Sequence, residues 1–269
     1  MLQSPIMQWD PEDYAKNSSA QLVWAKGLIE RLHLHGDEAL LDVGCGDGKV
    51  SAAIAAAVPH GFVLAVDNSA AFIDYARAHY PVSEQTNLRF EQMDACHLYS
   101  ERYFDVVYSN AVLHWVADQP AFLSGVFRLL KPGGRLVISC GGRDNAANVV
   151  TAMQTVIRRP AWAVYFGDFP FPYHFHDDGD YRSWLSQAGF VVERAELVDK
   201  DMTHPGREGL LGWLRTTWMP YTQRVPETDR ERLISDCAYT YLRSHPLDDS
   251  GLCHVKMVRL EVEAHKPGK

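Results

Sequence analysis

A cluster of glycines and acids, Asp42-Val-Gly-Cys-Gly-Asp47-Gly, overlaps the end of the short apolar run Ala39–Val43. Glycines directly after a strand allow a sharp turn into a helix and let the backbone approach a ligand closely. Loops of this kind occur in nicotinamide- and flavin-dependent enzymes as well as in others, so the glycines alone do not identify the ligand. They predict a cofactor site at the end of the first strand.

The charges around this loop separate the candidate cofactors. A dinucleotide rests its pyrophosphate on the helix N-terminus, where added negative charge is unfavourable. Asp42 and Asp47 place two carboxylates around the turn, and Lys49 stands where a GxGxxG motif needs Gly or Ala. S-adenosylmethionine carries a sulfonium and an ammonium group, which carboxylates attract. The loop therefore favours S-adenosylmethionine over NAD, with an NAD-dependent oxidoreductase as the alternative from a different class.

Two further acids follow the next two predicted strands. Asp67 ends the run Phe62–Val66, where a carboxylate can accept hydrogen bonds from the ribose hydroxyls of either cofactor. Asp94 follows the third strand, where it can accept from an adenine amino group. Each acid also has a purely structural interpretation: Asp47 or Asp67 as a helix cap, and Asp94 as a turn former. An acid after each of three successive strands is more specific than the glycines.

The elements that position these residues alternate between strands and helices, which is typical of a doubly wound α/β fold with a mostly parallel sheet. Predicted strands are Ala39–Val43, Phe62–Val66, Leu88–Phe90, Phe104–Tyr108 and Arg135–Ser139, and predicted helices are Lys49–Val58, Ala70–His79 and Pro120–Leu130. A tight turn is expected at Lys131–Gly134. Later elements are a helix at Asp180–Ala188, a strand at Phe190–Leu197, two helices within 206–244, and an edge or antiparallel strand at Val255–Ala264.

Composition limits the partners and the compartment. Acidic residues outnumber Lys and Arg by 34 to 26, and a net charge of −8 disfavours nucleic acid and anionic membrane surfaces, so a small organic substrate is expected. The five cysteines are scattered, without a CxxC pair, and predict neither a zinc site nor a disulfide framework. The acidic N-terminus lacks the features of a signal peptide, and no apolar run is long enough to span a membrane. We expect a cytoplasmic monomer or homodimer.

With DVGCGDG, Asp67, Asp94, FDVVYSNAVLHW and LKPGGRLVIS in this order, the chain resembles the class I S-adenosylmethionine-dependent methyltransferases from about Ala39 to Ser139. The resemblance implies a Rossmann-like sheet of seven strands whose antiparallel last strand is Val255–Ala264. It also implies S-adenosylmethionine as the cofactor and S-adenosylhomocysteine as its product. The cofactor-binding residues would be Asp42, Gly44, Cys45, Gly46, Asp67, Asn68, Asp94, Ala95 and Asn110.

A closer resemblance extends to nearly the whole chain. The opening Trp9-Asp-Pro-Glu-Asp-Tyr14, the stretch SNAVLHWV and the segment GLLGWLRTTWMPYTQ are similar to trans-aconitate methyltransferases, and the spacing from Tyr14 to Gln21 with His114-Trp115 resembles the insect juvenile hormone acid methyltransferases. Both families esterify carboxylic acids, and in the second a Gln and a Trp hold the substrate carboxylate. These positions match Gln21 and Trp115. The resemblance implies a small, partly apolar acid as substrate, oriented by Tyr14, Gln21 and Trp115.

The acceptor chemistry has alternatives. A carboxylate is already ionised near pH 7 and needs no base, so neutral donors such as Gln21 and Trp115 suffice to orient it. A phenol or amine acceptor would need a base, for which His114 is the candidate; an activated carbon acceptor is a further alternative. In structural interpretations, Trp115 is a core aromatic, His114 a residue hydrogen-bonded to backbone, and Gln21 a polar helix position.

We predict a helical cap at 1–38, a cofactor-binding core at 39–142, an aromatic lid at 143–180, and the end of the sheet with a helical insert (206–244) at 181–269. The lid segment matches neither carboxyl methyltransferase family. Its aromatic residues are Phe166, Phe169, Phe171, Tyr173 and Phe175. His174, His176, Asp177 and Asp178 have metal-ligand types, but without further anchored ligands no metal is predicted. Arg143, Arg158 and Arg159 could reach a second substrate carboxylate or form solvated surface charge.

Overall fold

A computed structural model describes residues 11–12 and 27–268, which divide into two compact units. The sheet unit comprises the described parts of Ser19–Arg143, Tyr173–Val198 and Val258–Lys269. The helical unit comprises the described parts of Met1–Ser18, Asp144–Pro172 and Asp199–Met257. The predicted division into cap, core, lid and insert remains a prediction.

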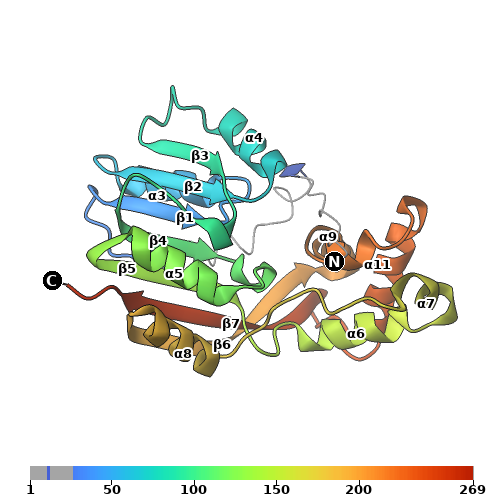
Figure 1. The fold of residues 1–269 in the computed structure, drawn as a ribbon. Coiled ribbons are helices and arrows are strands. Elements are labelled where there is room, and N and C mark those ends of the chain that lie inside the picture. Colours follow the sequence, from blue (N-terminus) through green and yellow to red (C-terminus); the bar gives the residue numbers. More distant parts are fainter. Residues whose placement is uncertain (1–10, 13–26, 269) are drawn as a thin grey trace. The chain divides into compact units, whose positions relative to one another are not determined.

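The sheet has seven strands in the order β3-β2-β1-β4-β5-β7-β6 (Figure 1). β1 to β5 pair in parallel, and β7 pairs antiparallel with β5. This confirms the predicted mostly parallel, doubly wound sheet, but β7 lies between β5 and β6 and is not an edge strand. The strands are β1 (Ala39–Val43), β2 (Phe62–Asp67), β3 (Leu88–Gln92), β4 (Phe104–Asn110), β5 (Leu130–Gly141), β6 (Val191–Pro205) and β7 (Leu252–His265).

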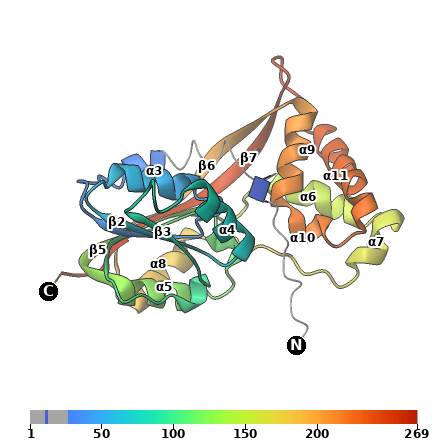
Figure 2. The same ribbon diagram turned by 90° about the horizontal axis from the view of Figure 1, so that it is seen from above.

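Helices cover both faces of the sheet (Figure 2). One face packs against α3 (Lys49–Ala57) and α4 (Ala70–His79), and the other against α5 (Gln119–Leu129) and α8 (Asp178–Ala188). Two short 3₁₀ turns follow strands, η1 (Ala95–His97) after β3 and η2 (Leu113–Trp115) after β4. Each parallel strand is connected to the next by a segment that crosses one face of the sheet. The carboxyl ends of the parallel strands, and the loops that follow them, therefore lie at one edge of the sheet.

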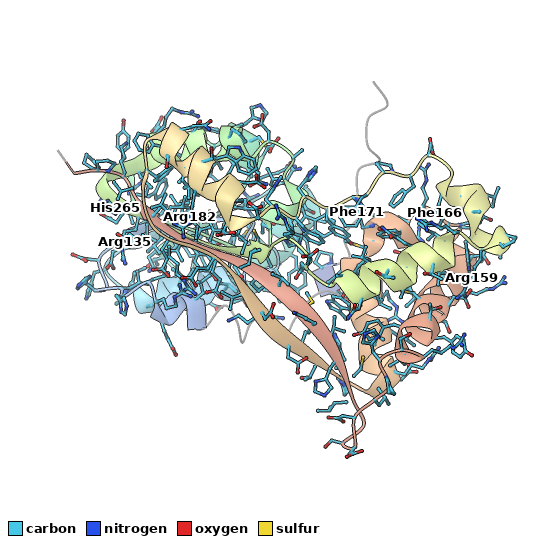
Figure 3. The ribbon with its side chains drawn as sticks, turned by 90° about the horizontal axis from the view of Figure 1, so that it is seen from below. Arg135, Arg159, Phe166, Phe171, Arg182 and His265 are labelled. Carbon is cyan, nitrogen blue, oxygen red and sulfur yellow. The ribbon has the colours of Figure 1, made fainter. Side chains whose placement is uncertain are left out.

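In the helical unit, residues 11–12 are helical, and five further helices lie between residues 144 and 257. They are α6 (Ala147–Ile157), α7 (Pro160–Phe166), α9 (Gly206–Thr217), α10 (Met219–Thr222) and α11 (Glu227–Leu242), with α11 packed against α6 and α9. Hydrogen bonds connect α7 and the residue before it to α11. The indole of Trp162 donates to Asp236 (2.8 Å), and Arg159, the N-cap of α7 labelled in Figure 3, donates to Thr240 (2.7 Å). Two of these helices, α6 and α7, lie inside the predicted aromatic lid at 143–180. The predicted insert at 206–244 contains three helices, whereas two were predicted.

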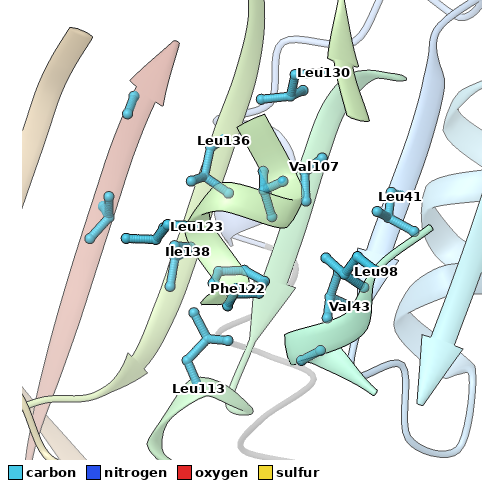
Figure 4. Close-up of a cluster of buried hydrophobic side chains, with 14 of the residues drawn as sticks. Leu41, Val43, Leu98, Val107, Leu113, Phe122, Leu123, Leu130, Leu136 and Ile138 are labelled. Atoms are coloured by element: carbon cyan, nitrogen blue, oxygen red, sulfur yellow. The ribbon is translucent and has the colours of Figure 1, made fainter. Parts of the chain in front are cut away.

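The core explains why the strand sequences are apolar without alternation. Leu40, Val63 and Val106 face the α3 and α4 side, whereas their neighbours Leu41 and Val107 face the α5 side (Figure 4). Both faces of a parallel sheet are buried, so both sets of side chains must be apolar. Among the residues described, no helix has the length and apolarity to cross a membrane.

The segment predicted as a tight turn before β5 belongs to the strand. Leu130 pairs with Phe104 and Arg135 with Val106, so the residues between form a bulge. The amide of Gly133 donates to the carbonyl of Lys266 (2.9 Å), and the Lys266 amide donates to the carbonyl of Gly134 (2.8 Å). The prediction of the boundary was wrong because a residue at the far end of the chain supplies these hydrogen bonds.

Candidate functional site

The glycine loop and Asp67 lie together at the carboxyl ends of β1 and β2. The amides of Gly44 and Cys45 donate to the carbonyl of Val66 (2.7 and 3.0 Å), and the Gly46 amide donates to the Asp67 carboxylate (3.0 Å). Ser69 is the N-cap of α4, so the helix does not need Asp67 as its cap. Burial raises the pKa of Asp67. The backbone thus holds this carboxylate at the loop, where the sequence places a cofactor.

Two more carboxylates surround the same turn. Asp42 is buried and accepts a hydrogen bond from the hydroxyl of Ser51 (2.6 Å). Burial and the nearby charge of Asp67 raise the pKa of Asp42 to about 7. Asp47 is also buried, pairs with the ammonium of Lys49 (3.0 Å), and accepts from the amide that begins α3. The turn therefore concentrates three acids in a small, desolvated volume, which favours a cationic ligand.

Gly44 has a structural requirement of its own. Its φ of 82° is unfavourable for other residues, and a Cβ there would lie 2.0 Å from a methyl carbon of Val112. Val112 is the residue before η2. The glycine loop and the turn after β4 are therefore in direct contact, which the sequence pattern did not reveal.

Asp94, Ala95 and Asn68 come from the adjacent strand ends. Asp94 caps η1 by accepting from the amide of Cys96 (2.8 Å) and contacts the ring of His97 (3.2 Å). It therefore has the structural role of a turn former that the sequence analysis considered. About half of its side chain is exposed (49%), which leaves acceptor positions for a ligand. Ala95 is buried, and the Asn68 carbonyl accepts from Gln92 (3.0 Å).

Asn110 meets a residue that sequence reasoning missed. Arg259 on β7 is 4% exposed, and its guanidinium donates to the side-chain oxygen of Asn110 (3.2 Å). The same group donates to the carbonyl and hydroxyl of Ser139 (2.7 and 3.2 Å). The sequence analysis gave Arg259 no role, because the strand that contains it alternates apolar and polar residues. The interior place of β7 in the sheet explains why this arginine is buried.

The η2 turn carries His114 and Trp115. The Gly141 amide donates to Nδ1 of His114 (3.3 Å). Nδ1 therefore has no proton, and the neutral ring carries its proton on Nε2. Desolvation by the surrounding protein and the positive charge of Arg259 lower the pKa of His114 to about 3. His114 is thus hydrogen-bonded to the backbone, as its structural interpretation expected. Its low pKa disfavours a role as general base.

The predicted lid aromatics separate into two groups. In the sheet unit, Tyr173 packs against Trp115 (4.9 Å between ring centroids) and stacks on Phe175 (5.3 Å), and the His174 amide donates to the His114 carbonyl (2.8 Å). In the helical unit, Phe166 and Phe169 pack together (5.3 Å) and Phe169 contacts Tyr221 (4.9 Å). Phe171 is partly exposed (43%; Figure 3). Within the sheet unit, Trp115 therefore has the rings of His114 and Tyr173 beside it.

The other candidates from the sequence are two arginines, the metal-ligand side chains of the lid, and Tyr14 with Gln21. Arg143 pairs with Asp177, the N-cap of α8, and Arg159 binds Thr240, so these two cations have protein partners. No group of three or more metal-ligand side chains occurs within residues 11–12 and 27–268. Tyr14 and Gln21 lie outside the described residues.

Comparisons with known proteins relate this chain to methyltransferases. Residues 41–138 match the family model described as "Methyltransferase domain". The chain is 30% identical to an uncharacterized methyltransferase of Schizosaccharomyces pombe, over 97% of this chain and 99% of that one. It is also 30% identical to a trans-aconitate 2-methyltransferase of Deinococcus radiodurans, over 85% of this chain and 88% of that one. Among solved structures, a Haemonchus contortus phosphoethanolamine N-methyltransferase 2 shares the fold (TM-score 0.60, 17% identity, 96% of this chain and 57% of that one).

Proposed function

The chain belongs to the class I S-adenosylmethionine-dependent methyltransferases, and on this premise we propose that it methylates a carboxylate oxygen of a small organic acid. One observation carries the choice of acceptor: Nδ1 of His114, the candidate base beside Trp115, already accepts the Gly141 amide, and the pKa of this ring is lowered to about 3, which makes it a weak base. The named activity of the Deinococcus radiodurans relative supports the same choice.

The residues at the glycine loop fit the cofactor. S-adenosylmethionine supplies an electrophilic methyl group on a cationic sulfur. Asp42, Asp47 and Asp67 surround the loop with negative charge, which attracts a cation and would repel the pyrophosphate of NAD. We assign Asp67 to the ribose hydroxyls and Asp94 to the adenine, with Asn68, Ala95 and Asn110 completing the wall. Backbone groups of Gly44, Cys45 and Gly46 form the floor.

The acceptor side needs orientation more than acid–base chemistry. Methyl transfer is an in-line displacement, so a nucleophile held behind the methyl group reacts much faster than one that diffuses freely. A carboxylate is ionised near pH 7 and loses no proton in the reaction. His114 Nε2–H and Trp115 Nε1–H are neutral donors for it, and the guanidinium of Arg259 adds a positive charge nearby. Gln21 and Tyr14 complete this proposal from the sequence.

The substrate is proposed to be a small acid with an apolar part. Tyr173 and Phe175 form an aromatic surface beside Trp115 that suits hydrocarbon better than a second charge. The net charge of −8 supports a small-molecule partner over nucleic acid.

The test is methyl transfer by the full-length chain to a panel that pairs each carboxylic acid with its amide and its alcohol. We expect turnover of one or more acids and none of the uncharged analogues. A Gln21→Ala, Trp115→Phe double variant should lose at least about a hundredfold in kcat/KM for the acid while still binding S-adenosylmethionine. Normal turnover by that variant would remove these residues from the acceptor site, and transfer only to phenols or amines would overturn the proposal.

A further inference from the structure

The turn that presents His114 and Trp115 is irregular backbone. It begins after Ala111, a non-glycine residue with a φ of 62°, and continues through the short 3₁₀ turn η2 before α5 starts. Left-handed backbone at a non-glycine residue is unfavourable and persists only where the surroundings enforce it. Within the turn the Val112 carbonyl accepts from the Trp115 amide (2.8 Å) and the Leu113 carbonyl accepts from the Val116 amide (3.0 Å), and the carbonyl oxygens of the turn can accept from further donors.

The side chain of Gln119 supplies them. Gln119 is the first residue of α5 and is 0% exposed. Its Nε2 donates to the carbonyl of Leu113 (2.7 Å) and to the carbonyl of Val116 (2.6 Å), one at each end of the turn. Because carbonyl oxygens only accept hydrogen bonds, the orientation of this amide is fixed.

Tyr181 on α8 holds Gln119 from the other side. Its hydroxyl donates to Oε1 of Gln119 (2.5 Å), and its side chain is 1% exposed. The hydroxyl also lies beside the thiol of Cys140 on β5, and burial raises the pKa of Tyr181, so it remains a donor at physiological pH. Two donors and one acceptor of Gln119 are thus all engaged in a dry environment, where such bonds are strong and specific.

We propose that Gln119, locked by Tyr181, is the positioning residue of the acceptor site: it fixes the η2 turn so that His114 and Trp115 meet the substrate carboxylate in one orientation. This inference rests on the proposed function for what the turn holds. Gln119 is fully buried within the protein and has no exposed surface to offer to a ligand. It acts through the two carbonyl groups of the turn, and the glycine loop keeps its own hydrogen bonds to β2 without it.

The test compares Tyr181→Phe with Tyr241→Phe. Tyr241, in the helical unit, is equally buried and donates to the carbonyl of His254 (2.6 Å), so the control loses a similar hydrogen bond elsewhere. We expect Tyr181→Phe to lower kcat/KM for the acceptor acid about tenfold through a raised KM, with less than about a twofold change in the Kd of S-adenosylmethionine. Gln119→Met, which removes all three hydrogen bonds at similar volume, should have a larger effect.

A second readout does not depend on the substrate. Hydrogen exchange of the peptide 111–119, which contains the amides of Trp115 and Val116, should be faster in Tyr181→Phe than in wild type and unchanged in Tyr241→Phe. If wild type methylates no acid, the proposed function fails, and this exchange alone decides the positioning claim. Unchanged exchange, or a Tyr181→Phe variant that only melts earlier and keeps its acceptor KM, would overturn the inference.

Discussion

The guanidinium of Arg259 on β7 donates to the side-chain oxygen of Asn110 at the end of β4, over 3.2 Å. Together with its bonds to Ser139 on β5, this contact joins three strands of the sheet, β4, β5 and β7. It also fixes the Asn110 amide so that its NH₂ group points away from Arg259. A residue from the last strand therefore shapes a site whose sequence motifs all lie in the first half of the chain.

Replacing Arg259 with Gln should lower the free energy of unfolding by about 2–3 kcal/mol, because the buried oxygens of Ser139 and the partly buried side-chain oxygen of Asn110 lose a charged donor. Arg182, which donates to the Ala195 carbonyl from an exposed position on α8, is the matched control. Arg182→Gln should cost less than about 1 kcal/mol. Equal losses in chemical denaturation would show that the burial of Arg259 has no special weight.

His114→Asn should retain activity. The asparagine oxygen can replace Nδ1 as acceptor for the Gly141 amide, so we expect kcat within about tenfold of wild type, whereas loss of a true base costs about 10²–10⁴-fold. The pH profile of wild-type kcat/KM should show no step at the ordinary histidine pKa near 6.5, since the pKa of His114 is about 3. Steady-state kinetics across this range check both statements, and a step that disappears in the variant would restore His114 as a base.

Asp42 should make the cofactor-free protein less stable as the pH rises. Its pKa is raised from 3.8 to about 7, so the folded protein keeps a proton that the unfolded chain has lost. The stabilisation that the protonated Asp42 contributes to the folded state is complete below about pH 4 and is lost as the pH rises through about 7. The difference in Tm between wild type and Asp42→Asn should follow that window, and it should shrink when a cationic cofactor favours the ionised carboxylate. A difference that is constant with pH would contradict the assignment.

Gly44→Ala should lower the free energy of unfolding by about 3 kcal/mol, from left-handed backbone and from the clash with Val112. Val112→Ala removes the two methyl carbons that would lie 2.0 and 2.6 Å from the new Cβ and keeps the Cβ of residue 112 at 2.7 Å, so it relieves the clash in part. The double variant should therefore recover about 1 kcal/mol relative to the sum of the single changes. Strict additivity in urea denaturation would mean that Val112 does not enforce glycine here.

The parallel sheet and the position of the glycine loop were predictable because local sequence patterns determine them. The apolar run Val63–Val66 is buried on both faces of the sheet. Acids that follow the ends of parallel strands lie at one edge of the sheet whatever the details of packing. Asp67 and the glycine loop are in contact as expected. These features depend on neighbours in sequence or on the register of adjacent strands.

Residues whose role depends on distant contacts could not be predicted. Arg259 is buried because β7 is an interior strand, and Gln119 is buried because Tyr181 arrives from a helix 62 positions along the chain. The β5 boundary depends on Lys266 in the same way. Single-sequence patterns contain no information about which partner fills such a position, so these residues resembled ordinary polar or charged surface.

The ester nature of the product is the most direct test of the central claim. Wild-type protein is incubated with the acid panel and S-adenosylmethionine carrying an isotopically labelled methyl group, and the product is then treated with mild alkali. We predict that the label is transferred to an acid and released as methanol, since only a methyl ester hydrolyses under these conditions. Label that is transferred but stays bound after alkali would show an ether, amine or carbon acceptor and would contradict the account.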